Sequence, residues 1–155
     1  MEKEEVLLRL NSACHSLLEH DRELLVVDAN ERSITHKLAE HLQAEFPGWN
    51  VDCEYNRDGF DPKRMTYTVE SVSTDNTEAK TVFPDIIVHE RGTQARNLLV
   101  IEAKKRTSGN ANSDREKLKA YKLQMSYTFA YSVVFPVLSE ALTASASIDV
   151  NEAQL

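Results

Sequence analysis

Two short apolar segments, residues 83–88 and 98–104, constrain the fold of this chain more than any other feature of its sequence. Both segments are rich in Ile, Val and Leu, as is typical of strands that are buried on both faces of a sheet. The connection between them is short and contains Gly92. A short glycine-containing connection between two such strands predicts an antiparallel hairpin.

The register of this hairpin brings charged residues together at one end of the sheet. If Arg91 faces Arg96 across the loop, Asp85 lies directly opposite Glu102. Lys104 follows Glu102 by two residues, and residues two apart on a strand point to the same face. The sequence therefore predicts two carboxylates and one ammonium group at the end of two apolar strands.

Such a pair of carboxylates needs compensation, because two carboxylates about 4 Å apart repel by roughly 4 kcal/mol at a near-surface dielectric constant. A shared proton would raise the pKa of one of them. A bound Mg²⁺ would be held by one or two carboxylates together with water and a phosphate oxygen. Lys104 also offsets one charge by itself, so a simple ion pair with Glu102 is a third interpretation.

A helix is predicted over residues 28–46, before the hairpin, because an apolar residue recurs at every fourth position from Ile34. Pro47 and the glycine after it end this helix. Glu31 lies in its first turn and is a candidate site residue. Asp28 and Glu31 also fit a variant of the capping box, in which both carboxylates serve only the helix terminus.

Together, Pro84-Asp85 and Glu102-Ala103-Lys104 on successive strands resemble the signature of the PD-(D/E)XK nuclease superfamily, which includes type II restriction enzymes and archaeal Holliday junction resolvases. The resemblance covers residues 28–137. It implies an α/β fold with a restriction-endonuclease-like αβββαβ core, in which helices flank a mixed central sheet. An extra N-terminal helix precedes this core.

The resemblance also implies a Mg²⁺-dependent endonuclease-like phosphodiesterase that leaves a 5′-phosphate, with Mn²⁺ as a substitute metal. In this interpretation Asp85, Glu102 and the backbone carbonyl of Ala103 bind the metal. Glu31 binds a second metal or orients the attacking water. Lys104 positions that water or stabilises the charge that develops on phosphorus.

The distribution of charge indicates where phosphates would approach. The net charge is −7, but residues 96–122 carry eight basic and three acidic side chains. Lys105 and Arg106 directly follow the Glu-x-Lys triplet and are the expected phosphate contacts, with Arg57 as a further candidate. The expected nucleic acid is DNA. The basic residues of the following helix also fit a solvated helix face.

The length and composition suit a single domain over residues 1–155. An acidic amphipathic helix over residues 4–26 is expected to pack on the core or to form a homodimer contact. A polar connection follows over residues 57–81, and residues 64–72 are a candidate strand. Residues 138–155 are expected to form a polar tail.

Further elements are expected towards the C-terminus. A helix is predicted over residues 114–124, with Ser113 as its N-cap, and a strand over residues 127–137. No apolar run has membrane-spanning length, and the N-terminus lacks the basic region of a signal peptide. Cys14 and Cys53 show no metal-ligand spacing and are expected to be buried thiols, so the expected location is the cytoplasm.

Two other classes of function remain open at this stage. The same fold also serves as a non-catalytic binding or assembly module that acts with a partner protein, and the acidic overall charge is compatible with that role. A small structural domain is a further possibility, with Asp85, Glu102 and Lys104 forming only an ion-pair network.

Overall fold

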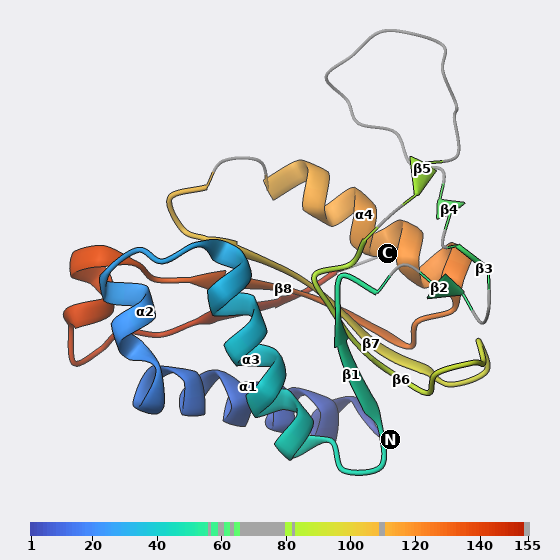
Figure 1. The fold of residues 1–155 in the computed structure, drawn as a ribbon, viewed down its shortest axis with the longest axis horizontal. Coiled ribbons are helices and arrows are strands. Elements are labelled where there is room, and N and C mark those ends of the chain that lie inside the picture. Colours follow the sequence, from blue (N-terminus) through green and yellow to red (C-terminus); the bar gives the residue numbers. More distant parts are fainter. Residues whose placement is uncertain are drawn as a thin grey trace, which may run out of the picture.

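The structure, a computed structural model, describes residues 1–55, 83–108 and 111–153, together with four two-residue strands between residues 57 and 81. Its centre is a five-stranded mixed sheet. The helices near the N-terminus cover one face of this sheet, and a single later helix, α4, covers the other (Figure 1). The predicted α/β class, with helices flanking a mixed sheet, is confirmed.

The sheet has the strand order β1 (Asn50–Cys53), β6 (Ile86–His89), β7 (Asn97–Lys105), β8 (Phe129–Phe135) and β9 (Asp149–Glu152). Strands β7 and β8 are parallel, and the other neighbouring pairs are antiparallel. A parallel pair needs a long crossover connection, which α4 supplies here. Apart from the short strands β2 to β5 between β1 and β6, the chain thus runs helix, strand, two hairpin strands, helix, strand from α3 to β8.

Both strands of the central hairpin are continuous apolar runs because both faces of the sheet are covered. Ile86 and Val88 of β6 belong to the core on the side of α1 and α3. Ile87 belongs to the second core, on the side of α4, together with Val100 of β7 and Leu118 of α4. This alternation separates the two hydrophobic clusters, while residues 86–88 and 98–101 form continuous apolar runs.

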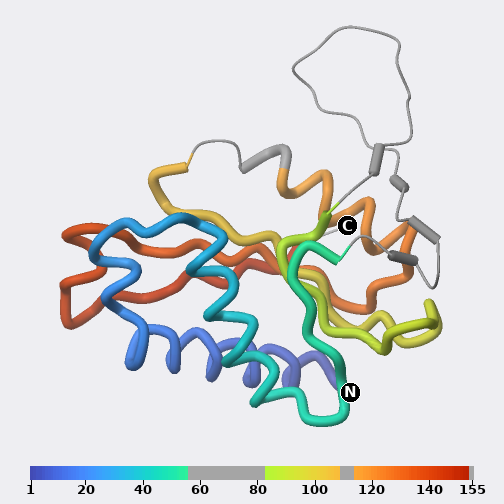
Figure 2. The backbone as a smooth tube through the Cα atoms, viewed as in Figure 1, coloured from blue at the N-terminus to red at the C-terminus, as the bar shows by residue number. Residues whose placement is uncertain are grey.

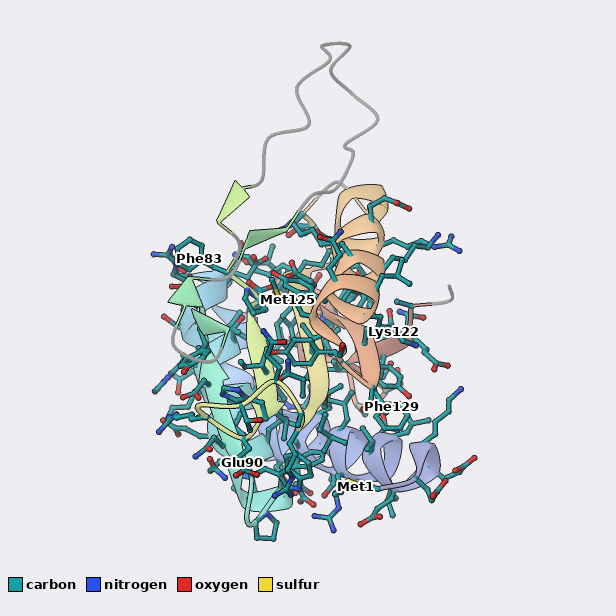
Figure 3. The ribbon with its side chains drawn as sticks, turned by 90° about the vertical axis from the view of Figure 1, so that its right-hand side faces the viewer. Met1, Phe83, Glu90, Lys122, Met125 and Phe129 are labelled. Atoms are coloured by element: carbon teal, nitrogen blue, oxygen red, sulfur yellow. The ribbon has the colours of Figure 1, made fainter. Side chains whose placement is uncertain are left out.

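The predicted hairpin register is confirmed at its inner end, where Ile86 pairs with Ile101. One step further along, this register sets Asp85 opposite Glu102. The predicted loop is wrong by one position, because the register shifts after Val88 and Glu90, not Arg91, pairs with Arg96. The turn near Glu90 faces the viewer in Figure 3. Glu90 directly follows β6, whereas Asp85 directly precedes it, so the two lie at opposite ends of this strand.

Three helices cover the first face: α1 (Lys3–His20), α2 (Arg22–Val26) and α3 (Glu31–Glu45). The prediction of one helix over residues 4–26 is wrong, because Asp21 leaves the helical conformation with φ −126° and ψ 19°. The carboxylate of Asp21 lies 2.7 Å from the ring of His41 on α3. The contact between Asp21 and His41 thus connects the C-terminal end of α1 to α3.

The start of α3 also differs from the prediction. Asp28 has a positive φ of 51°, so it lies outside the helix. Asn30 is the N-cap, and its side chain accepts a hydrogen bond from the backbone N–H of Arg32 at 2.9 Å. The interpretation of Asp28 and Glu31 as a capping box is therefore wrong. The C-terminal end of the helix, before Pro47, is confirmed.

On the opposite face, α4 (Ala111–Met125) packs across β7 and β8. Leu118 and Tyr121 of α4 are fully buried against the sheet. The predicted start of this helix at residue 114 is three residues too late, so Ser113 lies inside the helix and is not its N-cap. The side chain of Ser113 lies outside the described residues.

The segment after β8 is folded onto the sheet, so the prediction of a polar tail is wrong. A short 3-10 helix, η1 (Leu138–Leu142), turns the chain back, and β9 then pairs antiparallel with β8. Figure 2 shows this red C-terminal segment returning beside the sheet. Exposed residues alternate with half-buried ones in β9, as suits an edge strand with one solvated face.

The connection between β1 and β6 contains four short strands: β2 (Arg57–Asp58), β3 (Asp61–Pro62), β4 (Arg64–Met65) and β5 (Lys80–Thr81). They form two separate two-stranded ribbons. The strand predicted over residues 64–72 begins with β4, and its remainder lies outside the described residues.

The two cysteines differ from each other. Cys14 is buried in α1, as predicted, but Cys53 at the end of β1 is exposed, so that part of the prediction is wrong. None of the helices in the described part of the chain is long and apolar enough to cross a membrane.

Candidate functional site

Four chain segments converge at the end of the sheet where β7 finishes: the first turn of α3, the residue before β6, the last residues of β7 and the first turns of α4 (Figure 1). They enclose a hollow of about 200 Å³, here termed the carboxylate hollow. Its charged lining residues are Glu31, Asp85, Glu102, Lys104, Asp114 and Lys117. The hollow thus holds all four residues for which the sequence predicts a catalytic role.

Asp85 is fixed by the neighbouring strand, because its Oδ2 accepts a hydrogen bond of 2.7 Å from the backbone N–H of Ala103. Burial raises the pKa of Asp85 to about 6, and the nearby Glu31 and Asp114 carboxylates add to the rise. The hydrogen bond from Ala103 and the charge of Lys117 oppose it. Asp85 is therefore held in place without enough positive charge nearby to restore its ordinary pKa.

Glu102 is the most deeply buried charged residue of the hollow, with only 4% of its surface exposed. Its Oε2 accepts a hydrogen bond from Lys117 Nζ at 3.2 Å. Its Oε1 is buried and has no hydrogen-bond partner within the described part of the chain. Burial raises the pKa of Glu102 to about 8, and the neighbouring Asp85 adds to the rise. A buried acceptor without a partner is rare and costly in a native structure.

Glu31 reaches the hollow from the opposite side of the sheet end. Its Oε2 accepts a hydrogen bond of 3.1 Å from the backbone N–H of Lys105. This contact joins the first residue of α3 to the end of β7. The side chain of Glu31 is thus directed at the strand that carries Glu102.

Ala103 contributes backbone atoms. Its N–H points to Asp85, and within one strand residue the N–H and the carbonyl point to the same side. The carbonyl of Ala103 therefore also faces the β6 side of β7, where Asp85 lies. This is the arrangement that the sequence-based interpretation of Ala103 requires.

Lys104 lies in the hollow, but its partner was not foreseen from the sequence. Its Nζ donates to Asp114 of α4 at 3.1 Å, whereas Lys117 of the same helix pairs with Glu102. Asp114 and Lys117 are three residues apart and so lie on one face of α4. That face packs on the side of the sheet to which Glu102 and Lys104 point. Acidic and basic residues at this spacing, in the helix that follows a Glu-x-Lys strand, are the signal that would have identified them.

The two residues expected to contact phosphate have partners inside the protein. Lys105 Nζ donates to Asp28 at 2.7 Å and to the carbonyl of Ala29 at 3.2 Å. Arg106 bonds to the carboxylates of Glu140 and Asp149, both at 2.8 Å. These contacts tie the end of β7 to the segment before α3, to η1 and to β9. Nucleic-acid contact through Lys105 and Arg106 stays a prediction, and the side chain of Arg57 lies outside the described residues.

Replacing Lys105 with Ala should lower the free energy of unfolding by about 1–2 kcal/mol, because it removes two hydrogen bonds from a mostly buried ammonium group. Lys119→Ala is the matched control, since the contact of Lys119 within the described part of the chain is a long ion pair of 3.7 Å with Glu116. That control should cost less than about 0.5 kcal/mol. Urea unfolding of both variants measures the difference, and equal losses would contradict a structural role for Lys105.

The hollow offers oxygen ligands of the kind that Mg²⁺ prefers. Within residues 1–55, 83–108 and 111–153, no group of three or more His, Cys, Asp and Glu side chains is arranged so that it would hold a metal ion as it stands. Mg²⁺ needs only one or two carboxylates, because water and substrate oxygens complete its coordination. Asp85 and the unpartnered Oε1 of Glu102 meet that smaller requirement in ligand type.

Comparisons of the chain with protein-family models, with curated proteins and with solved structures found no match. The geometry and charge of the carboxylate hollow are therefore the basis on which a function is assigned.

Proposed function

We propose that this chain is a Mg²⁺-dependent nuclease with a restriction-endonuclease-like αβββαβ core, which hydrolyses phosphodiester bonds of DNA and leaves a 5′-phosphate. The observation that carries this proposal is the buried Oε1 of Glu102, which has no hydrogen-bond partner among the described residues and lies beside the carboxylate of Asp85. The element order from α3 to β8 and the approach of Glu31 to the same hollow support it.

The energetics of the hollow argue for a ligand. Burial raises the pKa values of Asp85 and Glu102, which means that their charged forms are unfavourable without further compensation. Apolar or amide side chains of similar size would serve stability better at these positions. Two carboxylates with perturbed pKa values that share one hollow are instead typical of a functional site, and a divalent cation would favour their ionised forms.

In the proposed reaction, Asp85, Glu102 and the carbonyl of Ala103 would hold Mg²⁺, and Glu31 would orient the attacking water from the edge of the hollow. When bound, Mg²⁺ supplies positive charge at the scissile phosphate and a water of lowered pKa. The water oxygen forms a bond to phosphorus and gives up a proton to solvent, while the bond from phosphorus to the 3′ oxygen breaks. That oxygen takes up a proton, which leaves a 5′-phosphate and a 3′-hydroxyl group.

Lys104 and Lys117 supply the positive charge that the chain itself brings to the phosphate. Lys104 is paired with Asp114 and Lys117 with Glu102 in the absence of substrate. A cation bound at Glu102 would take over the charge compensation that Lys117 provides there. Both ammonium groups line the hollow, so both lie where the charge on the phosphate increases in the transition state.

The alternative is a non-catalytic binding or assembly module that acts with a partner protein. It is favoured by the ion pairs of the hollow, because Lys104 and Lys117 each have an acidic partner without any metal. The described carboxylates also form no cluster of three that is ready for a metal ion. This alternative leaves the unpartnered oxygen of Glu102 without an explanation.

Two measurements on the wild-type protein separate these functions. We expect Mg²⁺ or Mn²⁺, but not Na⁺ at matched ionic strength, to raise the melting temperature. We also expect cleavage of at least one member of a panel of supercoiled plasmid, linear duplex, single strand, four-way junction and RNA, and loss of that cleavage in EDTA. If neither metal stabilises the protein and no substrate is cut, the nuclease proposal is wrong and the binding module is favoured.

Replacing Lys104 with Ala should reduce cleavage by about 10²–10³-fold, because a positioned positive charge near the reacting phosphate is lost. Metal affinity should be unchanged or higher, since a competing cation has gone. Lys119→Ala is the control, because it removes an equal positive charge from α4, where Lys119 pairs with Glu116. This variant should retain full cleavage. Calorimetry decides the role of Lys104: if the variant no longer binds Mg²⁺, Lys104 is structural.

A further inference from the structure

A pocket of about 390 Å³ lies between α4, β8 and β9, on the far side of Lys104 from the carboxylates. Leu118 of α4, Val134 of β8 and Ala153 form apolar walls. Its volume lies within the range typical of small-molecule sites, which combine apolar walls with a few polar groups. The ion pairs of the carboxylate hollow do not explain this pocket.

The pocket is continuous with the candidate site, because Lys104 lines both of them. On the opposite side of the carboxylates, a hollow of about 210 Å³ shares Glu31 and Asp85 with the carboxylate hollow. The three cavities therefore follow one another across the end of the sheet. A polynucleotide chain with one phosphate at the carboxylates would have its neighbouring nucleosides on either side, one of them at the pocket.

The polar groups of the pocket suit a nucleobase. Ser132 and Asn151 offer a hydroxyl and an amide, which together can donate and accept hydrogen bonds beside the apolar walls. Arg115 is exposed beside them and can contact a phosphate. Among the described lining residues, the acidic Glu152 is paired with Lys3 at 2.5 Å, so its charge is offset.

A base held between a helix and an edge strand has left its own helical stack. Removing a base from a duplex costs a few kcal/mol, and a base that is already unpaired avoids this cost. We propose that the pocket between α4, β8 and β9 binds an unpaired nucleoside next to the scissile phosphate, so that the chain acts on single-stranded segments of DNA. This inference rests on the proposed nuclease function and specifies its substrate.

The test uses short DNA that carries 2-aminopurine at successive positions, with Ca²⁺ in place of Mg²⁺. Ca²⁺ also binds carboxylate oxygens but tolerates looser geometry, so binding is measured with little cleavage. We expect the single strand to bind at least about tenfold more tightly than the blunt duplex of the same sequence. The fluorescence should change most at one position, adjacent to the bond that Mg²⁺ cleaves.

Asn151→Ala is the matched variant, because Asn151 is exposed and its loss should leave the fold intact. It should weaken single-strand binding by about fivefold and remove the position-specific fluorescence change, with little effect on duplex binding. Asn11→Ala on the exposed face of α1 is the control and should change neither.

The outcomes separate this inference from the proposed function. If the protein cleaves DNA but binds the blunt duplex as tightly as the single strand, and Asn151→Ala has no effect, the inference is overturned and the nuclease proposal stands. If no nucleic acid is bound or cut with any divalent metal, both are overturned.

Discussion

Replacing Asp85 with Asn or Glu102 with Gln should reduce metal-dependent cleavage by about a thousandfold or more. Each change removes the negative charge of one proposed metal ligand while keeping the size of the side chain. The positive charge that a metal supplies to the scissile phosphate is worth several kcal/mol, and each 1.36 kcal/mol corresponds to a tenfold change in rate. The same variants should lose most of the rise in melting temperature that Mg²⁺ causes in the wild-type protein.

Glu90→Gln is the matched control for these two variants. Glu90 lies at the exposed turn of the central hairpin, at the end of the sheet remote from the hollow, where it pairs with Arg96. It should keep the full cleavage rate and the full response to Mg²⁺. Cleavage close to the wild-type rate in Asp85→Asn or Glu102→Gln would place the active site elsewhere in the chain.

The second large effect is on stability. In the absence of divalent metal, the wild-type protein should lose stability as the pH rises from about 4.5 to about 8 relative to a Glu102→Gln variant. Burial raises the pKa of Glu102 from 4.5 to about 8, so over this interval the carboxyl group is ionised in the unfolded chain but still protonated in the folded protein. The unfolded state then binds fewer protons, and stability falls with increasing pH.

Below about pH 4.5 the group is protonated in both states and contributes no difference, whereas above about pH 8 the full cost is present. One pKa unit corresponds to 1.36 kcal/mol, so the cost at pH 9 is on the order of 4 kcal/mol. Asp85, whose pKa burial raises to about 6, adds a smaller loss of the same sign at lower pH.

Urea unfolding of the wild-type protein and of Glu102→Gln at pH 5 and pH 9 in EDTA measures this effect. We expect the variant to be more stable than the wild type at pH 9 and the difference to be much smaller at pH 5. Adding Mg²⁺ at pH 9 should narrow the gap by stabilising the wild-type protein alone. An equal difference at both pH values would mean that Glu102 is ionised in the folded protein throughout.

The central hairpin and the position of Asp85 opposite Glu102 were predictable because they depend on local rules. Side chains alternate along a strand with a period of two, and a short connection with Gly92 leaves few possible registers. The register shift after Val88 changed the turn but not the end of the hairpin that carries the carboxylates. Glu31 was placed correctly in the first turn of its helix for a similar reason, since the apolar stripe from Ile34 sets the face that packs on the sheet.

Other local features were wrong where tertiary contacts outweigh local preference. The helix over residues 4–26 is interrupted because Asp21 contacts His41 on α3. The C-terminal segment is polar and was expected to form a tail, yet the open edge of β8 gives β9 (Asp149–Glu152) backbone partners along its length. Neither contact is visible in the spacing of residues along the chain.

The sequence by itself determined the α/β class, the two buried strands and the meeting of Asp85 with Glu102, because periodicity and a short turn act over a few residues. Only the tertiary structure decided which cation serves which carboxylate. Lys117 reaches Glu102 because α4 docks on that face of the sheet, whereas Lys105 turns to the other face and binds Asp28. Ion pairs form between whichever charges the packing of helices and strands brings within a few ångströms, and that packing is set by the apolar faces and not by the charges themselves.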